Sequence, residues 1–304
     1  MLVRSAEVRD ALDSGRPVVA LESTLLAHGL PRPVNLEVGV GLERVVRDAG
    51  AVPATVAVLD GAVRVGLTSE QLGRVCEDPA VVKASLRDVA PALAQGVPAG
   101  TTVAATAWVA SRSGIAAFAT GGLGGVHRGA ATSFDVSADL DVLASCPLVV
   151  VCSGVKSILD VPATVERLET LSVGVLGYRT DRFPGFYVAD GGAPVTWRAD
   201  SPEEVARVAL ARHDLGLPQA LVVARPVPAD AELDPTLHDR VLAEALSATA
   251  AAGIGGRDLT PHLLAHVHAA TGGASLRANV ALVRANAELA ARVAVAVSAA
   301  LAAR

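Results

Sequence analysis

Two lysines and one glutamate are the residues of this sequence with the clearest chemical potential. Lys83 and Lys156 are the only lysines in a chain that otherwise uses arginine for its positive charge. Lys156 follows the apolar run VVVCSGV, so we expect it to be partly buried, which favours the neutral amine that a Schiff base requires. Glu22 ends the run VVALE, where a carboxyl group could act as a general acid. A snorkelling surface lysine and a turn-capping glutamate are the alternatives.

A glycine-rich segment and two aspartates lie between these positions. Residues 121–129 read GGLGGVHRG, in which backbone amides could approach an anion and His127 could add positive charge. The segment has neither the Lys-Ser/Thr ending of a Walker loop nor the spacing of a dinucleotide fingerprint, so a flexible turn is the alternative. Asp135 and Asp139 flank an expected helix start, where they either bind a hard divalent cation or stabilise the helix, one as its N-cap and the other as a first-turn acid.

The elements that must position these residues follow the pattern of an α/β layered protein, in which short Val-rich runs alternate with longer Ala- and Leu-rich segments. The expected strands are Pro17–Leu21, Thr55–Leu59, Ile115–Ala119, Leu148–Val151, Val173–Leu176 and Ala220–Val223. The expected helices are Val34–Asp48, Thr102–Arg112, Ala163–Leu171, Pro202–Asp214, Pro235–Ala252, Pro261–Ala270 and Leu276–Ala302. The step Asp60-Gly61 predicts a hairpin, so we expect a mixed central sheet. Ligands of such proteins bind where strands run out into loops.

Composition narrows the classes of function. The 304 residues are 51% hydrophobic and 19% charged, with a formal net charge of −5 and no run of Lys or Arg, so no nucleic-acid partner is expected. The N-terminus is too charged for a secretory signal, and the most apolar stretch falls short of a membrane span of about 20 residues. We therefore expect a cytoplasmic protein without a membrane partner. With no linker, repeat or composition break, residues 1–304 are predicted to form a single domain.

Ten segments of the sequence resemble the indigoidine synthase A-like family, also called the pseudouridine-5′-phosphate glycosidase family. They include ALESTLLAHGLP, VKASLRD, FATGGLGGVHRG, SFDVSADL, VVCSGVKSILD and TGGASLRANVALV, and they run in family order from about residue 15 to about residue 290. The resemblance implies a three-layer α/β/α domain that assembles as a homotrimer and uses a divalent metal, usually manganese (Mn²⁺). It also implies reversible C–C cleavage of pseudouridine 5′-phosphate to uracil and ribose 5-phosphate.

The resemblance also assigns roles to individual residues. It places the Schiff-base lysine at Lys156, the proton donor at Glu22 and the metal-binding aspartate at Asp135. The implied substrate contacts are Lys83, Val103, Ser137, Ala138, Asp139 and, for the base, Asn279. From its place in the glycine-rich segment, His127 is a further candidate for binding the phosphate group, together with Lys83.

The chemistry of a C-glycoside agrees with these roles. Ordinary glycosidases expel an oxygen leaving group with two carboxylates, whereas a C-glycoside has a far poorer carbon leaving group. An iminium between Lys156 and C1′ of a ring-opened ribose gives a covalent route, and Glu22 would protonate the uracil carbon as the bond breaks.

Two other functions remain open on the sequence alone. Departures from the family pattern at Arg32, Val34, Arg225-Pro226 and Ala285-Asn286 leave the base and the direction of reaction undetermined. A C-glycosynthase that joins ribose 5-phosphate to another carbon nucleophile would use the same residues. A non-catalytic sugar-phosphate-binding or scaffold protein would bind ribose 5-phosphate without forming a reducible adduct.

Overall fold

The computed structural model describes residues 2–252, 254 and 259–304 of the chain. Its strands are β1 (Leu2–Arg4), β2 (Val18–Leu21), β3 (Val52–Leu59), β4 (Ala62–Val65), β5 (Val82–Ala84), β6 (Ala99–Thr101), β7 (Ala117–Ala119), β8 (Val149–Cys152), β9 (Gly174–Tyr178), β10 (Arg182–Phe183), β11 (Ala193–Pro194), β12 (Trp197–Ala199) and β13 (Leu221–Ala224). Its helices are α1 (Ala6–Asp13), the π-helical turn η1 (Leu25–Gly29), α2 (Val34–Asp48), α3 (Ser69–Glu77), α4 (Leu86–Gln95), α5 (Val103–Arg112), α6 (Ala130–Ser133), α7 (Ala138–Leu143), α8 (Val161–Thr170), α9 (Pro202–Asp214), α10 (Pro235–Ala251), α11 (Leu259–Ala270) and α12 (Ala274–Ala302).

Eleven strands form one central sheet. Its main path runs β1-β4-β3-β2-β7-β8-β13-β9-β12, and β6 joins it through β3 and also pairs with β5. The strands β2, β7, β8, β13 and β9 are parallel neighbours, whereas β3 pairs antiparallel with β4 and β6. The sheet is therefore mixed, as the sequence predicts.

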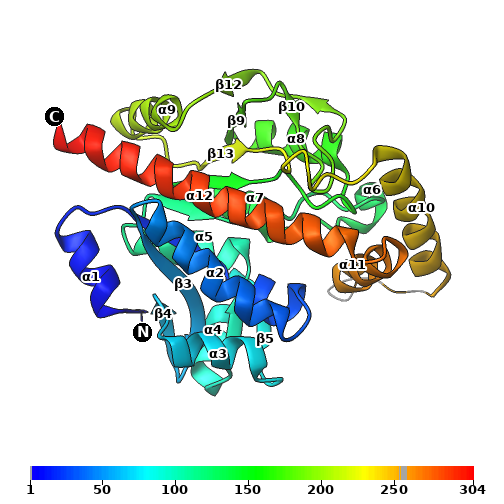
Figure 1. Cartoon of the computed structure of the whole chain (residues 1–304), viewed down its shortest axis with the longest axis horizontal. Coiled ribbons are helices and arrows are strands. Elements are labelled where there is room, and N and C mark those ends of the chain that lie inside the picture. The colour runs from blue at the N-terminus through cyan, green and yellow to red at the C-terminus, as the bar shows by residue number, and fades with distance from the viewer. Residues whose placement is uncertain (1, 253, 255–258) are drawn as a thin grey trace.

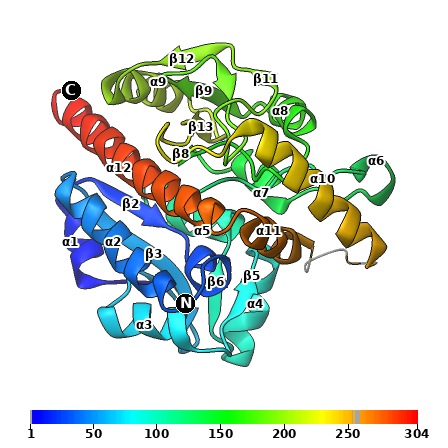
Figure 2. The ribbon, with the colours of Figure 1, turned by 45° about the vertical axis from the view of Figure 1, so that its right-hand side comes forward.

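Helices cover both faces of this sheet. In Figures 1 and 2, α2 and the long α12 lie on one face, and α5 and α7 lie on the other. The helix α12 crosses the molecule diagonally and contacts β2, β7 and β8 along its way. The three-layer α/β/α arrangement is confirmed, and α12 is a helix of one outer layer whose buried side packs on the sheet.

The antiparallel step between β3 and β4 is the predicted hairpin. Leu59 pairs with Ala62 across the turn, and Asp60 and Gly61 both have positive φ angles, of 52° and 65°. A tight two-residue turn of this hand needs positive φ at both central positions, which Asp-Gly tolerates. The hairpin makes β4 antiparallel to its neighbour and gives the sheet its mixed character.

The predicted strands and helices are present, with ends shifted by up to three residues. The largest shift is at β3, which begins at Val52. The prediction missed several short elements of the N-terminal third, including α3 and α4. The helix α3 begins with a capping box between Thr68 and Gln71, which is a readable signal, whereas Pro91 inside α4 argues against a helix.

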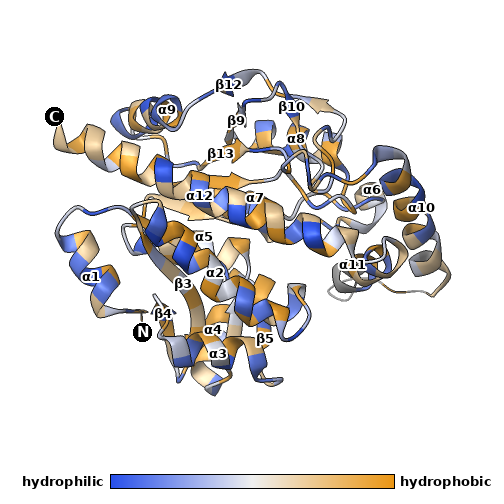
Figure 3. Ribbon diagram, in the orientation of Figure 1, coloured by the Kyte–Doolittle hydropathy of each residue, from blue (hydrophilic) through white to orange (hydrophobic). Residues whose placement is uncertain are grey.

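The core lies on both sides of the central strands. Every residue of β2, β3, β7, β8 and β13 is buried, as expected for strands covered on both faces. In Figure 3, blue bands alternate with orange ones along α12, since one side of this helix meets the sheet. None of the helices in the described part of the chain is both long and apolar enough to cross a membrane.

Candidate active site

Three neighbouring strands deliver their following residues to one edge of the sheet. Glu22 comes directly after β2, Thr120 directly after β7, and Lys156 four residues after the end of β8. Because β7 pairs in parallel with both β2 and β8, these strand ends lie side by side. The charges of Lys156 and Lys83 both act on the Glu22 carboxyl, so the predicted acid and both lysines lie near one another.

Glu22 is a buried carboxyl group, with 8% of its surface exposed. Burial raises its pKa above the usual range, and the positive charge of Lys156 and a hydrogen bond donated by Thr120 Oγ1 to Oε1 act in the opposite direction. Burial is the largest of these effects, so the acid form persists to higher pH than in an exposed glutamate. A carboxyl held in its acid form can donate a proton.

Lys156 is half-buried, as expected, in the loop between β8 and α8. Its backbone N–H donates to Leu123 O at 3.1 Å, and Leu123 N–H donates to Gly154 O at 2.9 Å. These two hydrogen bonds connect the loop that contains Lys156 to the glycine-rich segment. Within the part of the chain that the structure describes, Lys156 Nζ makes no hydrogen bond or ion pair, so this nitrogen is available to a ligand.

Lys83 and the beginning of α5 form one wall of the site. Lys83 lies on β5 opposite Gly100 of β6, and Thr102 N–H donates to Ala84 O at 3.0 Å, which brings the start of α5 beside it. Although Lys83 retains solvent exposure, desolvation by the protein around it and then the charge of Lys156 lower its pKa.

The first residues of α5 offer groups that suit an anion. Val103 is the first residue of this helix, where backbone N–H groups have no partner inside the helix. The Thr102 hydroxyl is buried and has no hydrogen-bond partner among the described residues. A helix N-terminus with a lysine beside it is a suitable site for a phosphate group.

The glycine-rich segment is fixed in place, which argues against the flexible turn. A Cβ atom at Gly124 would collide with Ser137 Oγ, and one at Gly125 would collide with Thr164 Oγ1. Gly124 N–H donates to Asp139 Oδ2 at 2.7 Å. Close packing against α7 and α8, rather than an unusual φ angle, therefore requires glycine at these two positions.

The predicted contacts Ser137, Ala138 and Asp139 form the start of α7. Ser137 is the N-cap, and its Oγ accepts from Asp139 N–H at 3.2 Å, so neither aspartate of the predicted pair caps the helix, whereas Asp139 is an acid of its first turn, as the alternative expects. Asp139 is buried, and its Oδ1 accepts from Ala104 N–H at 2.9 Å while Oδ2 binds the glycine-rich segment. This carboxylate therefore joins α5, α7 and the glycine-rich segment, and Ala138 is exposed.

His127 and Asp135 lie together at the rim. His127 Nδ1 is 3.8 Å from Asp135 Oδ2, and His127 N–H donates to Asp135 O at 3.0 Å. Burial, and the positive charges of Lys156 and Lys83, lower the pKa of His127, while Asp135 raises it.

The described residues include no group of three or more His, Cys, Asp or Glu side chains that could hold a metal ion. The Asp135 carboxylate is 39% exposed and accepts no hydrogen bond from these residues. It therefore fits a hard divalent cation of the kind that keeps most of its water and takes one or two carboxylates.

Asn279 lies on α12 beneath the glycine-rich segment. It is 7% exposed, and within the described chain its Oδ1 has no hydrogen-bond partner. A Cβ atom added to Gly121 would be 3.5 Å from this oxygen. A buried acceptor without a partner is costly unless a ligand supplies the donor, which is consistent with the predicted contact to the base.

Sequence reasoning missed a buried network behind Glu22. Asn286 of α12 donates through Nδ2 to Thr120 O at 2.9 Å and to Ser153 Oγ at 3.1 Å. The available signals were a threonine directly after a strand and an asparagine among the apolar residues of a long helix. Neither signal identifies its partner without the fold.

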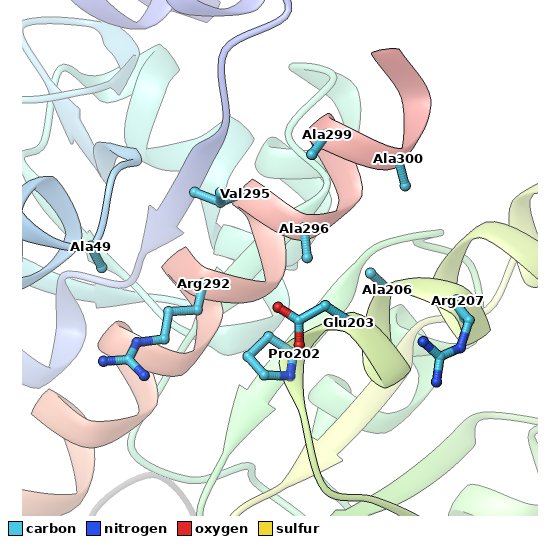
Figure 4. Close-up of a pocket in the computed structure, with 10 residues that line it drawn as sticks. All are labelled: Ala49, Pro202, Glu203, Ala206, Arg207, Arg292, Val295, Ala296, Ala299 and Ala300. Carbon is cyan, nitrogen blue, oxygen red and sulfur yellow. The ribbon is translucent and has the colours of Figure 1, made fainter. Parts of the chain in front are cut away.

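A groove between α9 and α12 contains none of the predicted site residues (Figure 4). Its volume is about 710 Å³, and alanine and valine side chains line most of it, with Glu203, Arg207 and Arg292 among its polar members. It lies toward the C-terminal end of α12. The chemistry-bearing side chains are at the strand ends, and we therefore place the candidate active site there.

The chain is similar to known proteins along most of its length. A sequence model of the family described as indigoidine synthase A-like protein matches residues 7–296. The chain is 62% identical over 293 residues to a pseudouridine-5′-phosphate glycosidase of Streptomyces griseus, covering 96% of this chain and 91% of that protein. It is 57% identical to the protein of the same name from Saccharopolyspora erythraea, with 96% of each covered.

Two solved structures have the same fold. The prealnumycin C-glycosynthase AlnA in complex with ribulose 5-phosphate has a TM-score of 0.93 and 38% identity, covering 100% of this chain and 99% of that one. An indigoidine synthase A-like protein from Thermotoga maritima has a TM-score of 0.88 and 35% identity, covering 98% and 97%.

Proposed function

The chain belongs to the indigoidine synthase A-like family, and we propose that it reversibly cleaves the C–C glycosidic bond of pseudouridine 5′-phosphate to uracil and ribose 5-phosphate. The observation that carries the proposal is that Lys156, whose side chain has no partner among the described residues, and the buried acid Glu22 follow β8 and β2, the two strands on either side of β7. The identity of 62% to a relative named for this activity supports it.

The phosphate group binds at the wall formed by Lys83 and the start of α5. Lys83 contributes charge, the Val103 N–H donates a hydrogen bond, and His127 adds a donor from the rim. The binding energy of this remote group holds C1′ of the ribose beside Lys156, which converts the attack into an effectively unimolecular step.

The covalent route begins when the Lys156 amine attacks C1′. The bond from Nζ to C1′ forms as the bond from C1′ to the ring oxygen breaks, and the nitrogen then gives up one of its protons to that oxygen, which leaves the nitrogen with a lone pair. The nitrogen lone pair then forms the C1′=N double bond while the bond from C1′ to the uracil carbon breaks. Glu22 donates its proton to that carbon, and uracil leaves.

Water then completes the cycle. It adds to C1′ of the iminium, and the collapse of the adduct releases the aldehyde form of ribose 5-phosphate and the free amine of Lys156. The Glu22 carboxylate recovers a proton in the same turnover. Run backwards, these steps form the C–C bond, so one site serves both directions.

Asp135 is the residue we propose to hold a divalent metal, Mn²⁺ by resemblance to the family. Its exposed carboxylate fits one ligand position of a hydrated hard cation. The ion would supply positive charge beside the anionic substrate. Titration of the purified protein with Mn²⁺, followed by the water-proton relaxation rate, should show binding that Asp135→Asn weakens.

A second function is favoured by the similarity to the prealnumycin C-glycosynthase AlnA. A C-glycosynthase would run the same iminium chemistry toward bond formation with a different carbon nucleophile in place of uracil. Turnover of ribose 5-phosphate with uracil, measured against other nucleobase-like acceptors, separates the two functions.

The assembly and location implied by the family are also part of the proposal. We expect residues 1–304 to act as one domain, in a homotrimer in the cytoplasm. Light scattering on the purified protein should give three times the chain mass of 30.7 kDa. A monomer of full activity would contradict the trimer and leave the chemistry unchanged.

The direct test of the proposed function is uracil release from pseudouridine 5′-phosphate, followed by chromatography. Wild type should release uracil, and Lys156→Ala should be slower by about 10⁴-fold or more, since a covalent catalyst is lost. Wild type that binds the substrate without releasing uracil would overturn the proposal and favour the glycosynthase or the binding protein.

A further inference from the structure

A chain of hydrogen bonds leads from the middle of α12 to the carboxyl group of Glu22. Asn286 is completely buried, and its Nδ2 donates to Thr120 O at 2.9 Å. The Thr120 hydroxyl, also completely buried, donates to Glu22 Oε1. A helix on one face of the sheet is thereby connected to the acid at the strand edge through a single intervening residue.

Asn286 also forms hydrogen bonds to Ser153, the residue that follows β8. Its Nδ2 donates to Ser153 Oγ at 3.1 Å, and its Oδ1 accepts from that hydroxyl at 3.4 Å. Backbone bonds from Thr120 N–H to Val151 O and from Ser153 N–H to Gly121 O, at 3.0 and 2.9 Å, hold β7 and β8 in register beyond their last paired residues. Since the polar groups of this buried network have partners, the network is rigid.

The two carboxyl oxygens of Glu22 differ in their hydrogen bonds. Oε1 accepts the Thr120 hydroxyl, whereas no hydrogen bond from a described residue reaches Oε2. A carboxyl group can rotate about its terminal bond, so an unheld acid would present its proton in many directions. A proton donor must lie within hydrogen-bond reach of the atom that it protonates.

We propose that Thr120 and Asn286 are positioning residues for Glu22. The Thr120 hydroxyl holds Oε1, the Asn286 amide holds the Thr120 peptide, and Oε2 is left to carry the proton toward the substrate carbon. This inference rests on the proposed function, because it gives Glu22 the role of proton donor.

The Thr120 hydroxyl also affects how the reaction rate depends on pH. The charged and titratable groups that act on Glu22 are Lys156, Asp139 and Lys83. The Thr120 hydroxyl stabilises the carboxylate and lowers the pKa of Glu22, so its removal should raise that pKa further. Because the donor must be protonated, activity falls as pH rises through this pKa. Loss of the hydroxyl therefore moves the falling limb of the pH profile to higher pH.

The test compares Thr120→Val, which removes the hydroxyl and keeps the shape, with Thr120→Ser, which keeps the hydroxyl. We expect Thr120→Val to lower kcat for uracil release by about 10- to 100-fold with KM changed less than about 3-fold, and to shift the falling limb to higher pH. Thr120→Ser should restore kcat to within about 3-fold of wild type. Thr249→Val, which removes a buried hydroxyl in α10, is the matched control and should keep wild-type kinetics.

Asn286→Leu provides a second arm, because it cuts the network one bond further from the acid. It should lower kcat by a smaller factor than Thr120→Val, at a temperature below its measured Tm. In both variants, borohydride should still trap a ribose 5-phosphate adduct, since Lys156 is unchanged.

The possible results distinguish a failure of this inference from a failure of the proposed function. Wild-type uracil release with Thr120→Val equal to wild type in kcat and pH profile would overturn the inference and leave the proposed function standing. A raised KM with unchanged kcat would also overturn it, because Thr120 would then bind substrate instead of orienting the acid. Absence of uracil release from wild type would overturn the proposed function and this inference with it.

Discussion

The candidate active site contains two regions that differ in burial and in hydrogen bonding. The inner site consists of Glu22, Thr120, Ser153 and Asn286. The outer rim consists of His127 and Asp135 together with Lys83 from the wall beside α5, and the exposed Phe134 precedes Asp135 in the chain. Glu22 is 8% exposed and belongs to a connected network, whereas Phe134 is 85% exposed and the Asp135 carboxylate accepts no hydrogen bond from the described residues.

The difference shows how chemistry and binding are divided. Proton transfer requires a carboxyl of raised pKa and fixed orientation, which burial and the network supply. Capture of an anion requires a positive group that is not already paired, and Lys83 provides it at the rim. Lys156 lies where the regions meet, since its charge acts on both Glu22 and His127. The account therefore predicts that inner-site changes lower kcat and rim changes raise KM.

Among changes to the inner site or the rim, Glu22→Gln in the inner site should have the largest effect on kcat. The amide cannot donate the proton as an acid, so kcat for uracil release should fall by about 10²–10⁴-fold. Because burial raises the pKa of Glu22, wild-type kcat should fall as pH rises through a value above the usual range, and this limb should vanish in the variant.

Glu43→Gln is the matched control for that experiment. Glu43 is a carboxyl on α2 whose pKa is also raised by burial, and it accepts the Thr55 hydroxyl at 2.7 Å outside the site. Its kinetics should stay within about 2-fold of wild type. Equal losses in the two variants would mean that removing any buried carboxyl harms the fold, and would remove the support for Glu22 as the acid.

A smaller effect, and one on binding, is expected from Lys83→Met. Loss of the ammonium should raise KM for pseudouridine 5′-phosphate by about 10- to 100-fold with kcat less affected, since a charged hydrogen bond contributes about 1.5–3 kcal/mol. Arg87→Met, which removes an 88% exposed cation four residues away, should leave KM unchanged. A fall in kcat at constant KM would show that Lys83 takes part in catalysis. It would then contradict the assignment of catalysis to the inner site and of binding to the rim.

The smallest effect should come from Phe134→Ala, next to Asp135 of the rim. Since this side chain is exposed, the free energy of unfolding should change by no more than about 0.5 kcal/mol. Phe118→Ala, in the fully buried β7, should lower it by about 3–5 kcal/mol. A loss above about 1 kcal/mol for Phe134→Ala, measured by urea unfolding, would show that another surface covers this residue in solution.

The sequence predicts the central strands well because they are covered on both faces and read as continuous apolar runs. It predicts ends less well because local caps decide them: α8 begins at Val161 since Asp160 accepts from Ala163 N–H at 3.0 Å. The short elements β5 and α4 contain Lys83 and Pro91, which break the usual patterns. Their existence depends on pairing and packing with the rest of the fold.

The sequence reveals only part of the arrangement of the candidate site. Lys156 and Glu22 were expected at one sheet edge, and the parallel order of β2, β7 and β8 brings them there. Asp139 was expected to line the substrate, but the sequence does not reveal that backbone amides occupy both of its oxygens. Asn286 lies more than 160 residues from Thr120 in the chain, so only the fold could show their hydrogen bond.

The central claim is that Lys156 forms an iminium with the sugar phosphate, and borohydride trapping with ribose 5-phosphate tests it most directly. Wild type, Glu22→Gln and Lys156→Ala are each reduced in the presence of the sugar and then weighed intact by mass spectrometry. We predict one pentose-phosphate adduct on wild type and on Glu22→Gln, and none on Lys156→Ala. No adduct on wild type that demonstrably binds ribose 5-phosphate, or an adduct retained by Lys156→Ala, would contradict the account.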